Sequence, residues 1–120
     1  MLESKGRLHV VGGGIQHSQD IGNLYLCSTV DVLMYVDEAD QWFSCVPLPS
    51  PRHGVGASSI GGVIFVCGGL TTNGIGGLSE VLVKSVNMDK WNVCKELPFP
   101  VSGHAVVTIP KLSRNLSVCD

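Results

Sequence analysis

The stretch that decides the fold is Gly62-Val63-Ile64-Phe65-Val66-Cys67-Gly68-Gly69, which repeats the pattern of Gly6-Arg7-Leu8-His9-Val10-Val11-Gly12-Gly13. In both places a short, mostly apolar run lies between a glycine and a glycine pair. The run at 63–67 is apolar on both faces, which is typical of a strand in a sheet covered on both sides. A glycine pair lets the chain turn sharply where side chains would collide. We therefore expect a buried strand followed by a tight turn at both places.

A longer internal repeat extends this pattern along the chain. Residues 32–60 and 81–109, which are offset by 49, are identical at ten of 29 positions. The identities include Asp-x-Trp, Leu-Pro-x-Pro and a cysteine three residues after each tryptophan. The two glycine-pair stretches are offset by 56, so the first unit carries seven extra residues within 14–30. A fixed period of this length indicates a repeat architecture.

Each repeat unit is predicted to contain four short strands. In the second unit we expect strands at residues 53–60, 63–67, 81–86 and 91–95. The stretch 70–79 holds three glycines and two threonines and is predicted to be a loop. Four-stranded units of about 50 residues are typical of a β-propeller blade, whose apolar faces are covered by neighbouring blades. The tryptophan of the fourth strand is expected to pack between blades.

These features resemble the kelch repeats of kelch-type β-propellers, from about residue 6 to residue 109. The resemblance rests on the glycine pairs, the aromatic positions and the Pro51-Arg52-His53-Gly54 motif. The residues that match the repeat pattern are Gly12, Gly13, Tyr35, Trp42, Gly68, Gly69 and Trp91. The resemblance implies an all-β, incomplete kelch-type propeller built from four-stranded antiparallel blades, with about 2.5 blade units in this chain.

The sequence also departs from the family pattern in the second and third units. Lys84 takes the position that Tyr35 occupies in the first unit, and Val101 takes the position of Arg52. After Ile109, the stretch 110–114 replaces a glycine-rich turn, and Cys119-Asp120 stands where a glycine pair is due. The last ten residues are therefore not expected to follow the fold.

The repeat pattern divides the chain into three parts. Residues 1–46 are interpreted as strands two to four of a first blade, 47–95 as a complete second blade, and 96–120 as the start of a third. Propellers close with about four to eight blades. We therefore expect a piece of a larger kelch protein, a truncated product or a unit that must associate. Self-association through uncovered blade faces is one possible outcome.

Composition excludes several classes of protein. Charged residues make up 15% of the chain and the net charge is −2, which argues against nucleic-acid binding. No apolar window is long enough for a membrane span, and the N-terminus lacks the apolar region of a signal peptide. The five cysteines form no Cys-x-x-Cys motif, which favours free thiols in a reducing compartment. These observations predict a cytoplasmic protein.

Motifs for metal, cofactor or phosphate binding are weak in this sequence. The four histidines have no ligand-like spacing, so no metal is expected; they are His9, His17, His53 and His104. A dinucleotide fingerprint after the first strand would need glycine where His17 stands, so no cofactor is expected. Cys45 and Cys94 recur at one repeat position and are predicted to pack. Cys27 lies outside the repeat and is the one candidate for exposure among the cysteines, with a buried thiol as the favoured alternative. The Asn115-Leu116-Ser117 acceptor motif is attributed to chance.

Candidate partner-binding residues follow from the kelch resemblance. In kelch propellers that bind peptides, loops at one end of the ring present arginine, serine and asparagine to the ligand. The matching candidates here are Arg52, Gln16, His17, Ser18, Thr71, Thr72 and Asn73. Guanidinium is suited to carboxylate recognition. A structural role for Arg52, bracing adjacent blades, is the equally weighted alternative.

The resemblance implies a non-catalytic module that recognises a protein or peptide partner. Its context would be an adaptor that presents substrates to a cullin-type ubiquitin ligase through a BTB module, which these 120 residues do not include. Binding to actin is the competing interaction role. An enzyme with a kelch-like propeller, of the sugar epimerase or oxidase type, would need converging carboxylates or copper ligands, and only Asp20 and Glu80 lie in the relevant loops. A truncated remnant without independent function is the remaining alternative.

Overall fold

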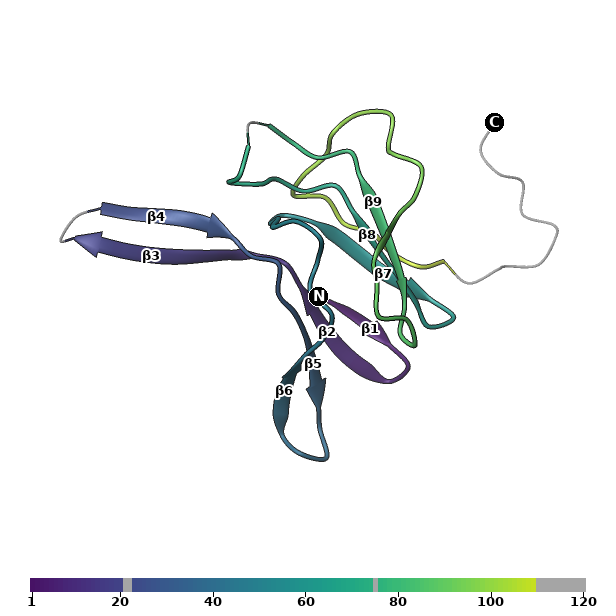
Figure 1. Ribbon diagram of the computed structural model, residues 1–120. Helices are drawn as coiled ribbons and strands as arrows, with labels where there is room; N and C mark the ends of the chain where they lie inside the picture. Colours follow the sequence, from purple (N-terminus) through teal and green to yellow (C-terminus); the bar gives the residue numbers. More distant parts are fainter. Residues whose placement is uncertain (21–22, 75, 110–120) are drawn as a thin grey trace.

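The computed structural model describes residues 1–20, 23–74 and 76–109, and it contains ten strands in this part of the chain. Figure 1 shows two sheets side by side and a separate two-stranded ribbon that projects from them. No helix occurs among the described residues. The all-β prediction is therefore confirmed for the described part of the chain.

Two four-stranded antiparallel sheets form the body of the molecule. The first sheet has the strand order β1-β2-β5-β6. Its strands are β1 (Leu2–Ser4), β2 (Arg7–Val11), β5 (Val32–Val36) and β6 (Gln41–Ser44). The second has the order β10-β9-β8-β7. Its strands are β7 (Gly56–Ile60), β8 (Val63–Cys67), β9 (Val81–Ser85) and β10 (Asn92–Val93). The strands that lead into the glycine pairs, β2 and β8, occupy the same place in the two sheets: each lies between the first strand of its unit and the third. This is expected for repeats of one blade.

The first sheet contains one strand more than the three that the repeat pattern predicted. Leu2–Ser4 forms β1, which pairs antiparallel with β2 in the register Leu2↔His9 and Ser4↔Arg7. Both Leu2 and Ser4 are buried, and β1 lies against β7 of the second sheet. Three residues are too few to show a strand period in a sequence, so only the pairing with β2 reveals this element.

The extra residues of the first unit form a hairpin rather than the loop that we expected after the first glycine pair. Strands β3 (Gly14–Asp20) and β4 (Asn23–Ser28) pair antiparallel, with Ile15↔Cys27 and Gln16↔Leu26 among the paired positions. The ribbon projects away from both sheets in Figure 1. The second unit has a shorter loop at residues 70–80, within which Leu70 and Gly77 form an isolated antiparallel β-bridge.

The segment predicted to begin a third blade is not a regular strand over residues 101–109. It nevertheless runs along β7, because the amide of Gly103 donates to the Gly54 carbonyl at 2.9 Å and the Thr108 hydroxyl donates to the Ser59 carbonyl at 2.7 Å. Its own partner strand would lie in 110–120, outside the described residues. The prediction about the last ten residues falls in the same range.

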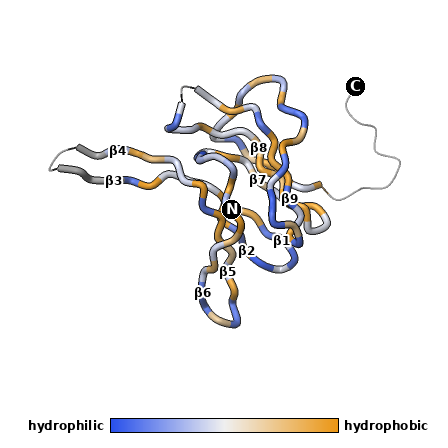
Figure 2. The backbone as a smooth tube through the Cα atoms, in the orientation of Figure 1, coloured by the Kyte–Doolittle hydropathy of each residue, from blue (hydrophilic) through white to orange (hydrophobic). Residues whose placement is uncertain are grey.

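The core lies between the two sheets. Three of its buried side chains come from the first unit and five from the second; they are Leu2, Val11, Val32, Leu48, Ile64, Val66, Leu82 and Trp91. Apolar positions follow the strands of both sheets, whereas the β5–β6 turn is hydrophilic (Figure 2). Removing this apolar surface from water is the main force that holds the sheets together.

Candidate functional site

The candidate partner-binding residues lie near the end of the sheets where the glycine pairs turn the chain. Here the segment Arg52-His53 passes between the two units. The amide of Gly13 donates to the Arg52 carbonyl at 2.9 Å, and the Arg52 amide donates to Thr29 at 3.1 Å. His53 exchanges two backbone hydrogen bonds of 2.8 Å with Leu70. The crossing segment therefore ties the base of the hairpin to the 70–80 loop.

Each glycine pair is required by this close passage of the next unit's backbone. A Cβ atom on Gly12 would lie 2.6 Å from the Arg52 carbonyl oxygen, and one on Gly68 would lie 2.5 Å from that of Val101. Both glycines also have positive φ angles, 62° and 64°. Arg52 and Val101 are equivalent repeat positions, so the two glycine pairs serve the same purpose.

The guanidinium of Arg52 points inward and its side chain is 0% exposed. Nη2 donates to Glu80 Oε2 at 2.8 Å and to Ser50 Oγ at 2.6 Å, while Nη1 is buried without a partner among the described residues. A buried, charge-assisted pair of this kind fixes the position of the groups that it joins. In this geometry Arg52 braces the 50–52 segment against the residues before β9, and it does not reach the surface.

A cluster of three hydrogen-bonded residues, Ser28, His53 and Thr72, joins the hairpin to the 70–80 loop. The Ser28 amide donates to Thr72 Oγ1 at 2.9 Å, and the Thr72 amide donates to Ser28 Oγ at 3.0 Å. Ser28 Oγ also lies 2.8 Å from His53 Nδ1. Ser28 Oγ therefore contacts both the Thr72 amide and the His53 ring. No sequence pattern pointed to Ser28, which lies in the extra residues of the first unit and has no repeat equivalent.

The other candidates are more scattered. Gln16, His17 and Ser18 lie on β3 of the projecting ribbon, and the side chain of Gln16 is exposed; the side chains of His17 and Ser18 lie outside the described part. Thr71 Oγ1 accepts from the Asn73 amide at 3.2 Å, and both Thr72 and Asn73 are exposed. The structure thus brings Arg52 and Thr72 to one junction, whereas Gln16 lies on the ribbon, paired with Leu26.

The hairpin also exposes apolar side chains that the sequence argument missed. Ile15, Tyr25 and Leu26 are all more than two-fifths exposed. Alternation along a strand places successive side chains on opposite faces of the ribbon. Alternation of exposed apolar residues within 14–30 has meaning only if this stretch forms strands, and it was interpreted as a loop.

The cysteines differ from expectation at one position. Cys94, expected to pack like Cys45, is exposed, whereas Cys27, the candidate for exposure, is half-buried. Cys45 packs against the core cluster. Burial raises the pKa of the Cys45 and Cys67 thiols, which keeps both protonated at neutral pH. In the described part of the chain no three His, Cys, Asp or Glu side chains gather as a metal site.

The tryptophans of the repeat show how the two units meet. Trp91 is buried and its indole Nε1 donates to the Val46 carbonyl of the preceding unit at 3.1 Å. Trp42, at the same repeat position, packs against Tyr35 with ring centroids 5.2 Å apart and is otherwise exposed. The Tyr35 hydroxyl donates to Asp40 at 2.6 Å, and this hydrogen bond raises its pKa. Of these two tryptophans, Trp91 contacts the preceding unit, whereas Trp42 packs on Tyr35 of its own unit.

Comparison with known proteins agrees with this geometry. The chain is 31% identical over 98 residues to Alpha-scruin of Limulus polyphemus, and 30% identical over 98 residues to Beta-scruin of the same organism. It is 34% identical over 70 residues to Kelch-like protein 41 of Homo sapiens. The chain contains kelch repeats. No family model matches the chain.

The kelch relatives are much longer than this chain. The scruin alignments cover 82% of the chain but 11% of each relative, and the Kelch-like protein 41 alignment covers 58% of the chain and 12% of that protein. The sheets described above therefore correspond to a small part of a kelch protein. No helix long and apolar enough to cross a membrane occurs among the described residues.

Proposed function

We propose that this chain is a non-catalytic kelch module that binds a protein partner through the β3–β4 hairpin and the 70–80 loop. The observation that carries the proposal is the hydrogen-bonded cluster of Ser28, Thr72 and His53, which holds the base of the hairpin and the loop at fixed positions. A surface with apolar centres and a polar rim is suited to protein association. Ile15 and Leu26 supply exposed apolar groups, and Asn73 supplies an amide.

Arg52 has a positioning role in this proposal and does not contact the partner. Its buried ion pair with Glu80 and its backbone bonds to Gly13 and Thr29 fix the junction from which the hairpin projects. A rigid base lowers the entropy lost when a projecting element binds a partner. Substitution of Arg52 would then weaken binding indirectly, together with stability.

The finer proposal is that the partner is a substrate of a cullin-type ubiquitin ligase. The likeness to Kelch-like protein 41 supports an adaptor context, in which a separate BTB module makes the cullin contact. In that context the protein is cytoplasmic. Actin binding, the other interaction role implied by the kelch resemblance, is the competing proposal.

The experiment compares hairpin and control variants of the full chain. Ile15→Ser with Leu26→Ser removes the apolar groups of the ribbon, and Ile60→Ser removes an exposed apolar group at the end of β7. Binding is measured by co-sedimentation with actin filaments and by co-purification with substrate proteins of cullin-type ubiquitin ligases. Loss of one interaction in the hairpin variant, with the control unchanged, supports the proposal and selects between the partners. Equal binding by all variants would contradict it.

A further inference from the structure

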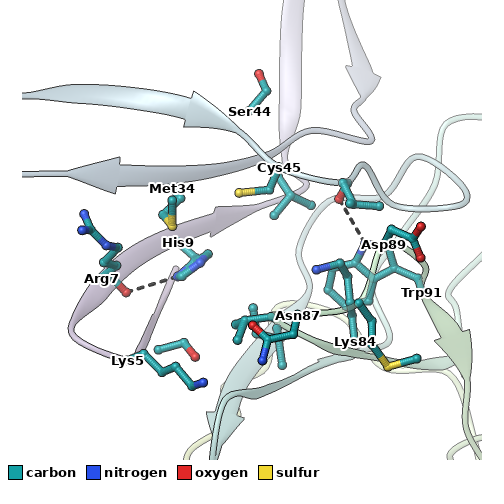
Figure 3. A pocket seen from close by; sticks show the side chains of 16 residues that line it. Lys5, Arg7, His9, Met34, Ser44, Cys45, Lys84, Asn87, Asp89 and Trp91 are labelled. Atoms are coloured by element: carbon teal, nitrogen blue, oxygen red, sulfur yellow. Dashed lines mark hydrogen bonds between the residues drawn. The ribbon is translucent and has the colours of Figure 1, made fainter. Parts of the chain in front are cut away.

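A cleft of about 570 Å³ lies between the two sheets, away from the hairpin junction. Its walls come from the β1–β2 turn, the facing strands and the turn after β9 (Figure 3). His9, Met34 and Cys45 line it from the first sheet, and Lys84 and Trp91 line it from the second. Clefts of this size are typical of sites for small molecules. No residue of the hairpin or of the 70–80 loop lines it, so it is separate from the surface proposed above.

Lys84 places an unneutralised positive charge in this cleft. Its side chain is only 8% exposed, and the one hydrogen bond of its ammonium runs to the Ser85 carbonyl at 3.2 Å. Among the described residues no carboxylate lies within ion-pair distance of Lys84, although Asp89 lines the same cleft. Lysine is almost never this buried unless it is paired, because loss of hydration disfavours the charge.

The repeat shows that this lysine is not needed for the fold. The equivalent residue in the first unit is Tyr35, whose hydroxyl is satisfied by Asp40 at 2.6 Å. The second unit keeps the carboxylate as Asp89 but replaces the tyrosine with Lys84. The substitution therefore introduces a buried cation where the sister unit has a hydrogen-bonded ring.

A second polar group in the cleft also lacks a partner. Ser4 is 2% exposed and its hydroxyl makes no hydrogen bond in the described part of the chain. A buried, unsatisfied hydroxyl costs free energy unless a ligand or water completes it. Ser4 lines the cleft from the first sheet and Lys84 from the second, although the Ser4 hydroxyl itself is covered.

The other titratable groups do not cancel the charge of Lys84. Burial lowers the pKa of His9, and the neighbouring Lys84 charge lowers it further, so His9 is neutral at pH 7. Burial raises the pKa of the Cys45 thiol, which is therefore not a thiolate. At the mouth of the cleft, Arg7 is occupied by Glu38 at 3.1 and 3.3 Å, whereas Lys5 has no ion pair among the described residues. Lys5 and Lys84 outweigh the single carboxylate of Asp89.

We propose that this cleft binds a small organic carboxylate. The carboxylate would be held by the Lys84 ammonium, and the apolar body of the ligand would lie among the aliphatic and aromatic side chains of the walls. These apolar lining residues are Val32, Met34, Val46, Ile64, Val86 and Trp91. An inorganic anion would gain nothing from such walls, whereas an apolar molecule without a charge would leave Lys84 unpaired.

The test is a calorimetric titration of the full chain with sodium benzoate and sodium octanoate. Benzamide tests the need for charge, and inorganic phosphate tests the need for an apolar body. Saturable binding of at least one carboxylate is expected, with benzamide at least about tenfold weaker than benzoate because it leaves the buried cation unpaired. Absence of saturable binding, equal affinity for benzamide, or equal affinity for phosphate would each overturn the proposal.

A matched pair of lysine variants assigns the binding to Lys84. Lys84→Met keeps the length of the side chain without its charge, and Lys90→Met does the same at an exposed lysine that does not line the cleft. Lys84→Met should lower carboxylate affinity by about tenfold or more while leaving the melting temperature unchanged or higher, because it removes an unpaired buried charge. Lys90→Met should bind normally. Undiminished affinity in Lys84→Met would overturn the assignment, and its melting curve shows that the variant is folded.

Discussion

The two units of this chain place equivalent residues in opposite environments. Trp42 is 47% exposed and Trp91 is 8% exposed, although both stand three residues before a cysteine in the same repeat. Leu8 and Ile64 show the same contrast, at 43% and 3%. The second unit is buried on this face because the first sheet lies against it. In a blade repeat, therefore, a position becomes part of the core when a neighbouring sheet covers it, whichever residue stands there.

The largest effect that would test this comparison is truncation of the two tryptophans. Trp91→Ala should destabilise the chain by about 3–5 kcal/mol, because it empties the space between the sheets and removes the bond to Val46. Trp42→Ala should cost about 1 kcal/mol, since this ring is half in water already. Denaturant unfolding of both variants measures the difference. Equal costs would mean that a further layer covers Trp42 in solution.

The next effect concerns the junction between the units. Glu80→Gln should destabilise by about 2–3 kcal/mol, because it leaves the guanidinium of Arg52 buried without a counter-charge. Arg52→Met should cost less than Glu80→Gln, since it removes the buried charge together with its unpaired Nη1. Denaturation midpoints at neutral pH test this order. A larger loss for Arg52→Met would show that its hydrogen bonds to Ser50 outweigh the buried charge.

Glycine substitutions should behave alike in the two units, in contrast to the tryptophans. Gly12→Ala should cost about 2 kcal/mol or more, because its Cβ would meet the Arg52 carbonyl at 2.6 Å in a backbone with positive φ. Gly68→Ala should cost a similar amount through the Val101 carbonyl. Gly61→Ala is the control, since it has φ of 56° but nothing within 4 Å, and it should cost about 1 kcal/mol. Thermal unfolding of the three variants distinguishes steric contact from backbone strain.

The smallest expected effect is a pH dependence that belongs to one unit. Burial lowers the pKa of His9 below its ordinary 6.5, so the unfolded chain binds the proton more readily than the folded one. The stability contributed by neutral His9 is present above pH 6.5 and falls as the pH drops through the lowered pKa. His9→Phe introduces the residue found at the equivalent position, Phe65, and should flatten this part of the profile. An unchanged difference in unfolding free energy between pH 7 and pH 5 would contradict the assignment.

The blade repeat could be predicted from the sequence because the features that specify it are local. The run 63–67 and its glycine pair specify a strand and a tight turn without reference to distant residues, and β8 (Val63–Cys67) follows that prediction. β1 (Leu2–Ser4) was missed because its three residues carry no period and become a strand only by pairing with β2. The hairpin was missed because strand pairing within 14–28 depends on a register that polar residues specify weakly.

The candidate site was predicted only in part. The pattern led to Arg52 and Thr72, which do meet at one junction, but the orientation of the Arg52 side chain follows from Glu80, 28 residues away. Ser28, which completes the junction, lies outside every repeat and had no signal. The cleft around Lys84 was also invisible, since the sequence showed a lysine in place of tyrosine but not that a second sheet would bury it.

The sequence by itself determined the strand-forming runs, the glycine pairs and the period of the kelch units, because each depends on local backbone and side-chain preferences. Tertiary structure alone decided that Trp91 is core while Trp42 is surface, that Arg52 braces rather than projects, and that Lys84 lines a cleft. The physical reason is that burial and charge pairing depend on which sheet covers a residue, and that partner is supplied by distant parts of the chain.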